Sequence, residues 1–181
     1  MSREDLKRFC GLEIDFDSIG LLQDGAEDFA YFCTPVDAEF VGRVGCDGIH
    51  FILLPGDERV YCVSPEMGGE DTYVLPVAAD FREFLSFVLY YKDASILESV
   101  AWCSREKISE SLEESRAMER SGEMPEFFAR RDDALETIVR EYALRPAADP
   151  YDRIRALQSA FDPSILHFSD EYYDVLGIER K

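Results

Sequence analysis

The sequence lacks a long apolar run, a closely spaced pair of cysteines and an excess of basic charge. No stretch approaches the roughly 18 apolar residues that cross a bilayer, and the start at Met1–Asp5 carries no apolar signal segment. The five cysteines are scattered and form no Cys-x-x-Cys pair. This usage is typical of free thiols in a reducing compartment rather than of a disulfide framework or zinc site. We therefore expect a cytoplasmic protein.

Basic residues are scarce, with 19 Lys and Arg against 38 Asp and Glu and a formal net charge of -19. Such a field repels phosphate backbones and anionic lipid, so neither nucleic acid nor a membrane is an expected partner. A basic protein would instead be attracted and steered. The excess concentrates between Glu13 and Asp80, where the only basic residues are Arg43 and Arg59. Acidity also keeps proteins soluble, which is the ordinary explanation.

Catalytic and ligand-binding motifs are also missing. A Cys-His nucleophile pair could use Cys62 or Cys46 with His50, and His50 and Cys62 would be neighbours across a predicted hairpin. No oxyanion-hole or orienting motif accompanies them, and free cysteine is commonly buried. Asp15 and Asp17 share one strand face without the glycine-anchored loop of a calcium site. The Gly68-Gly69 pair lacks the Lys-Ser/Thr ending of a phosphate loop. We expect no catalytic residue, metal or cofactor.

Apolar patterning predicts an α+β fold with a small antiparallel sheet of about four to six strands. The predicted strands cover residues 12–17, 38–44, 49–54, 59–64 and 72–77. The run 49–54 is almost wholly apolar, so this strand should be central and covered on both faces. Pro76 removes a ladder donor and places the last strand at an edge.

Helices are predicted around the sheet and throughout the last part of the chain. Ser2 should cap a helix to about Cys10, and Asp80, with Glu83 three residues later, should cap another. The apolar stripe of this second helix should lie on the sheet; it comprises Phe81, Phe84, Leu85, Val88 and Leu89. Further helices are expected over 93–102, 104–120, 125–142, from 149 to about 161, and 169–177. We therefore predict an α+β domain over 1–103 and a helical C-terminal extension over 104–181 packed on it.

Two predicted loops carry clustered carboxylates. Asp57 and Glu58 stand on the tip of the hairpin that begins at Pro55-Gly56, and Glu66, Glu70 and Asp71 stand on the next loop. If tip and loop lie near each other, these five residues form one acidic rim and a candidate partner-binding site. The alternative is that loops are simply polar.

The segment 45–89 resembles the SUKH superfamily, a group related to a yeast cell-wall regulator. The likeness rests on the Asp47-Gly48 turn, the apolar strand 49–54, the strand 60–63, the segment 73–76 and the acidic-capped helix start 80–85. The resemblance implies a sheet followed by such a helix. It also implies a function, since many bacterial members are cytoplasmic immunity proteins that bind and neutralise toxins, and others are protein-interaction modules.

Together these features predict a non-enzymatic protein-binding module. In its most specific form it would be an immunity protein that occludes a basic toxin through its acidic loops. One alternative is a small enzyme with a pocket between the sheet and the C-terminal helices. A structural subunit of a homo-oligomer is a further alternative, and the sequence leaves the oligomeric state open.

Overall fold

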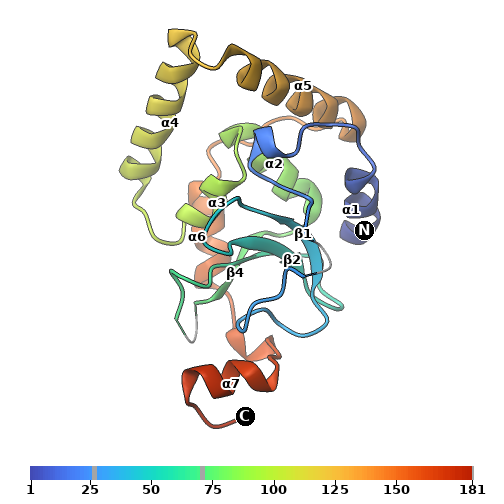
Figure 1. The fold of residues 1–181 in the computed structure, drawn as a ribbon, viewed down its shortest axis with the longest axis vertical. Coiled ribbons are helices and arrows are strands. Elements are labelled where there is room, and N and C mark those ends of the chain that lie inside the picture. The colour runs from blue at the N-terminus through green and yellow to red at the C-terminus, as the bar shows by residue number, and fades with distance from the viewer. Residues whose placement is uncertain (26–27, 70–71, 181) are drawn as a thin grey trace.

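The protein has an α+β fold built on a four-stranded antiparallel sheet in the order β1-β2-β3-β4 (Figure 1). The structure, a computed structural model, describes residues 1–25, 28–69 and 72–180. The strands are β1 Glu39–Arg43, β2 His50–Leu53, β3 Val60–Val63 and β4 Val74–Ala78. The predicted fold class is confirmed. The central position of β2 and the edge position of β4, which contains Pro76, are also as predicted.

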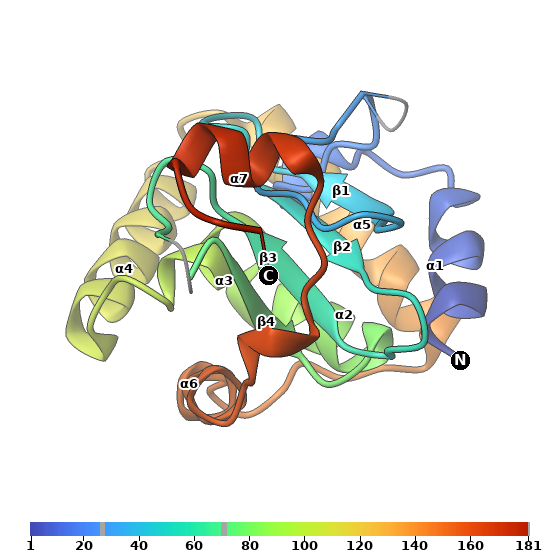
Figure 2. The same ribbon diagram turned by 90° about the horizontal axis from the view of Figure 1, so that it is seen from below.

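Seven α-helices and two 3-10 turns surround the sheet in the described part of the chain. The helices are α1 Ser2–Cys10, α2 Phe81–Tyr91, α3 Ser95–Ser99, α4 Arg105–Ser121, α5 Pro125–Tyr142, α6 Tyr151–Ser159 and α7 Asp170–Leu176; the 3-10 turns are η1 Asp17–Ile19 and η2 Pro163–Ile165. Seen from below, α7 and the chain leading to it cross the sheet face opposite α2 (Figure 2). The C-terminal half is helical, as predicted.

Side-chain alternation along β2 and β3 divides the interior into two cores. Phe51 pairs with Cys62 and both face α2, whereas Ile52 and Tyr61 face the opposite side. There they pack with Tyr172 of α7. Because successive strand residues point to opposite faces, the apolar run of β2 serves both cores at once.

Helix α2 is fixed by its cap and by its apolar stripe. The Asp80 carboxylate accepts a hydrogen bond from the Glu83 N–H (2.8 Å), and Glu83 Oε2 accepts one from the Ala79 N–H (2.6 Å). Glu83 therefore reaches one residue further back than an ordinary capping box requires. All five predicted stripe residues are buried, and the Phe84 ring packs on Phe51 at 5.2 Å between centroids. The predicted packing of this helix on the sheet is confirmed.

The predicted strand at 12–17 is wrong. Leu12, Ile14 and Phe16 do alternate, but they pack against the main core without pairing to a strand. The edge of β1 that an added strand would use is bridged instead by Leu22, which exchanges two backbone hydrogen bonds with Arg43 (2.9 Å each). The alternation of residues 12–17 therefore reflects half-burial against the main core rather than strand pairing. The helix predicted over 93–102 is likewise shorter and covers Ser95–Ser99.

Helices α4 and α5 form an arm beside the sheet layer (Figure 1). Helix α4 buries only Ile108, whereas α5 buries a full stripe and joins the main core. Arg131 of α5 is 4% exposed and pairs with Glu119 of α4 (2.7 Å), which also pairs with Lys92 after α2 (3.4 Å). The main core therefore includes residues from both sides of position 104. The predicted division there stays a prediction.

Candidate functional site

The structure does not bring Asp57 and Glu58 together with Glu66 into one rim. Asp57 and Glu58 precede β3, and Glu66 follows it. In an antiparallel meander, consecutive turns lie at opposite ends of the sheet, so the hairpin tip and the next loop are separated by the length of β3. Glu70 and Asp71 lie outside the described residues. The predicted role of these five residues in partner binding stays a prediction.

Asp57 is occupied by neighbours in its own hairpin. It accepts hydrogen bonds from the Arg59 guanidinium, the closest at 2.6 Å, and from the Tyr61 hydroxyl at 2.7 Å. Partial burial acts to raise the pKa of Asp57, but the bonds from Arg59 and Tyr61 outweigh it and lower the pKa to about 2. The charge that Asp57 would offer a partner is therefore largely offset by Arg59.

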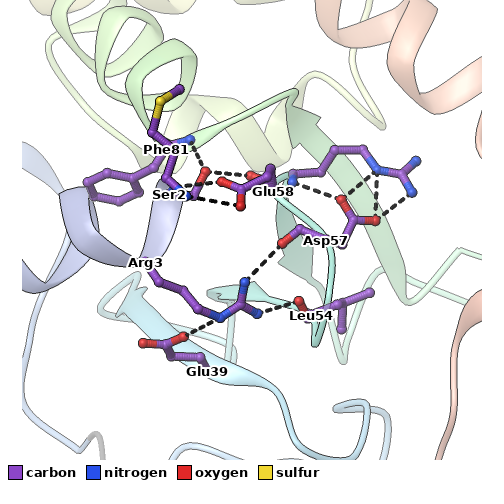
Figure 3. Close-up of polar contacts among 9 residues, drawn as sticks. Ser2, Arg3, Glu39, Leu54, Asp57, Glu58 and Phe81 are labelled. Carbon is purple, nitrogen blue, oxygen red and sulfur yellow. Dashed lines mark hydrogen bonds and ion pairs between the residues drawn. The ribbon is translucent and has the colours of Figure 1, made fainter.

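Glu58 holds the start of helix α1 (Figure 3). Its carboxylate accepts a hydrogen bond from the Ser2 N–H (2.5 Å), while the Ser2 hydroxyl donates to the Glu58 carbonyl (2.8 Å) and accepts from the Phe81 N–H (3.1 Å). Arg3 pairs with Glu39 (3.1 Å) and donates to the hairpin backbone. The prediction that Ser2 caps α1 is wrong: Ser2 is the first residue of the helix, and its hydroxyl joins the hairpin to α2. These contacts give Glu58 a structural role.

His50 and Cys62 do not form a nucleophile pair. His50 pairs with Val63 and lies on the α7 face of the sheet, whereas Cys62 lies on the α2 face. The His50 Nδ1–H donates to the Gly48 carbonyl (2.7 Å), and Nε2 accepts from the Thr34 hydroxyl (3.1 Å). Burial lowers the pKa of His50 and raises that of the Cys62 thiol, so both stay neutral.

An open hollow of about 310 Å³ lies at the other end of the sheet, beside the turn that joins β1 to β2. It is lined by Gly25, Asp28, Phe29, Tyr31, Arg43, Val44, Gly45, Cys46, Asp47, Gly48 and His50. Asp28 and Asp47 are exposed, and neither makes an ion pair within the described part of the chain. Arg43, the one cation in the lining, is held by Asp24 (2.7 Å). The hollow therefore carries unbalanced negative charge.

Aromatic rings form one wall of this hollow. Tyr31 is 47% exposed and stacks on His50, with centroids 5.9 Å apart and planes 23° apart. Phe29 meets the same imidazole edge-on at 5.5 Å. Gly48 has φ +66°, and a Cβ there would lie 2.5 Å from the Tyr31 ring. Glycine is thus needed at this turn both for its backbone and for the close approach of the ring.

A buried carboxyl group lies behind the same end of the sheet. Glu98 of α3 is 8% exposed and accepts hydrogen bonds from the Trp102 indole (2.6 Å) and the Ser64 hydroxyl (3.2 Å). Burial raises the pKa of Glu98; the hydrogen bonds oppose this shift, and the negative charge of Asp47 adds to it. Because no cation pairs with Glu98 among the described residues, its ionised form is the disfavoured one.

Replacing Glu98 with glutamine is expected to stabilise the protein at neutral pH. Because the folded-state pKa of Glu98 is raised, this residue does not lower the free energy of unfolding below its ordinary pKa, where it is protonated in both states. Its destabilising effect grows as pH rises through the folded-state pKa. A glutamine oxygen accepts both hydrogen bonds without a charge. We expect a gain of roughly 1 kcal/mol near pH 8 that vanishes near about pH 4. Urea unfolding of both proteins across this range measures it, and a difference that ignores pH would contradict the assignment.

Sequence reasoning missed most of the hollow. Asp47-Gly48 was recognised only as a turn, and Asp28, Tyr31 and Glu98 were not singled out. The glycine at a turn was the one available signal, because it can mark a close approach of another group. The approach of Tyr31 from 17 residues earlier along the chain is a tertiary contact that no local pattern encodes.

Comparison of the chain with protein-family models, curated proteins and solved structures finds no match in any of the three. The SUKH resemblance is therefore neither supported nor opposed. Within the described ranges, no helix is long and apolar enough to cross a membrane. The same residues contain no group of three His, Cys, Asp or Glu side chains placed to hold a metal ion.

Proposed function

We propose that this protein is a non-enzymatic binding module for a basic protein partner, which it engages at the end of the sheet that carries the hollow. One observation supports this most: exposed Asp28 and Asp47 flank an open hollow with a solvent-facing tyrosine. The net charge of -19 would steer a basic surface toward it. Aromatic side chains with a polar tip are also favoured at protein interfaces.

A binding role accounts for this end of the sheet better than catalysis does. The histidine in the lining has both ring nitrogens occupied by Thr34 and Gly48. Partial desolvation and the adjacent Asp47 charge raise the pKa of the exposed Cys46 thiol, which works against its acting as a nucleophile. A partner bound here would be neutralised by occlusion rather than by reaction. Inhibition of a basic toxin is the specific form of this function that the SUKH resemblance implies.

Reversing the two carboxylates of the hollow is expected to abolish most of the binding. The probe is a fluorescent peptide of about ten residues that alternates arginine with glycine and serine. Its affinity for the Asp28→Lys/Asp47→Lys variant should fall at least about tenfold, since two attractive charges become repulsive. Raising the salt from about 50 to about 300 mM should weaken binding to the unaltered protein, because screening shortens the reach of its field.

The matched control is Glu110→Lys/Glu114→Lys on α4, where both residues are exposed. This variant has the same net charge as the first, so an effect of net charge alone would weaken both equally. Fluorescence anisotropy measures the peptide affinity of all three proteins. Equal loss in the two variants, or affinity that ignores salt, would contradict the proposed site.

A further inference from the structure

Tyr31 lines the hollow, and neighbouring groups pack against its ring. The imidazole of His50 stacks against it, and the backbone of Gly48 lies under its hydroxyl end. The imidazole in turn is fixed by hydrogen bonds at both nitrogens. The ring therefore does not need to be ordered when a ligand arrives, which removes part of the entropic cost of binding.

The charges of the hollow favour a cation beside that ring. Asp28 and Asp47 line it without ion-pair partners among the described residues, while the positive charge of Arg43 is offset by Asp24. Asp47 and Gly48 are consecutive residues of the turn, and both have positive φ (+55° and +66°). The Asp47 carboxylate is therefore attached to the turn itself. A volume of about 310 Å³ is at the small end of ligand pockets and suits a single side chain.

We propose that this hollow is a receptor for an arginine side chain of the partner, whose guanidinium stacks on Tyr31 and pairs with Asp28 and Asp47. The inference rests on the proposed function and makes it specific. A guanidinium is planar and weakly hydrated, so it stacks on an aromatic face and still donates hydrogen bonds in its plane to carboxylates. A lysine ammonium is a compact, strongly hydrated charge that gains only the electrostatic part.

Three peptides of identical length and spacing test the inference on the full chain. They carry arginine, lysine or the neutral arginine analogue citrulline at the same positions, and calorimetry measures their affinities. The arginine peptide should bind about fivefold tighter than the lysine peptide, and the citrulline peptide should not bind measurably. In NMR spectra, the amide signals of residues 28–31 and 46–50 should shift with arginine peptide.

Two variants separate the ring from the charges. Tyr31→Leu should abolish the preference for arginine over lysine while leaving the weaker charge-driven binding of both peptides. Asp47→Asn should weaken both peptides, and asparagine accepts the positive φ of this position readily. The matched control Tyr90→Leu, on α2 and away from the lining, should change neither affinity. Thermal unfolding verifies that each variant is folded.

The outcomes distinguish the inference from the function beneath it. Equal affinity for arginine and lysine peptides, or an arginine preference that survives Tyr31→Leu, overturns the arginine receptor and leaves the binding module standing. Binding of citrulline as tight as that of arginine overturns both, because charge would then play no part. Failure of the arginine and lysine peptides alike to bind also overturns both.

Discussion

Truncation of Phe84 to alanine is expected to lower the free energy of unfolding by about 3–5 kcal/mol. The side chain is fully buried where α2 meets the sheet, and its ring contacts Phe51 (5.2 Å between centroids) and Phe81 (5.8 Å). The cavity cannot easily close, because the Asp80 cap fixes the start of α2 and the strand pairing fixes Phe51. Urea unfolding monitored by circular dichroism measures the loss.

Phe127→Ala on α5 is the matched control for this truncation. The same atoms are removed there from a half-buried ring, so the loss should stay below about 1.5 kcal/mol. Similar losses at the two positions would contradict the packing described for α2. Phe84→Leu should fall between them, since a smaller cavity remains.

The sheet and α2 were predictable because their signals are local. The hairpin follows from Pro55-Gly56 between two apolar runs, and the start of α2 follows from Asp80 three residues before Glu83. Pro76 indicated an edge strand, because proline has no backbone N–H to donate to a neighbouring strand. Each of these features depends on residues a few positions apart, whose preferences the tertiary structure left unchanged.

Residues that are distant in sequence determine what could not be predicted. Ser2 and Glu58 are joined by hydrogen bonds across 56 positions, and this contact makes a predicted helix cap and a predicted partner-binding residue parts of the framework. Residues 12–17 have a strand-like pattern but form no strand, because Leu22 pairs with Arg43 at the edge of β1 instead. In both cases the local preference is weak, and a partner from elsewhere in the chain decides the outcome.

The register of the β2–β3 hairpin determines whether His50 and Cys62 can lie opposite each other. Phe51 pairs with Cys62 and His50 pairs with Val63, so His50 and Cys62 lie on opposite faces of the sheet. A register shift of one residue would have placed them opposite each other, and sequence alone did not fix that choice. The antiparallel strand order places the β1–β2 turn, which lines the hollow, at the same end of the sheet as Ser64 and Glu98.

Tyr142 offers the sharpest test of whether the helical extension is part of one folding unit. It is 2% exposed at the end of α5, its hydroxyl donates to the Asp5 carbonyl (2.7 Å), and its ring lies under the guanidinium groups of Arg8 (4.9 Å) and Arg82 (5.7 Å). Tyr142→Ala is expected to cost about 3–5 kcal/mol, because it removes a buried ring that joins α1, α2 and α5.

The regions of the chain that lose stability after Tyr142→Ala show whether the two halves unfold together. If both halves share one cooperative core, hydrogen exchange of β2 and β3 amides should accelerate together with that of α5 amides after Tyr142→Ala. Tyr142→Phe keeps the ring and loses only the hydrogen bond to Asp5, so it should cost about 1 kcal/mol. Acceleration confined to α5, with unchanged protection in the sheet, would instead mean that the extension unfolds as a domain of its own, because destabilising one cooperative unit must expose all of its slowest amides equally.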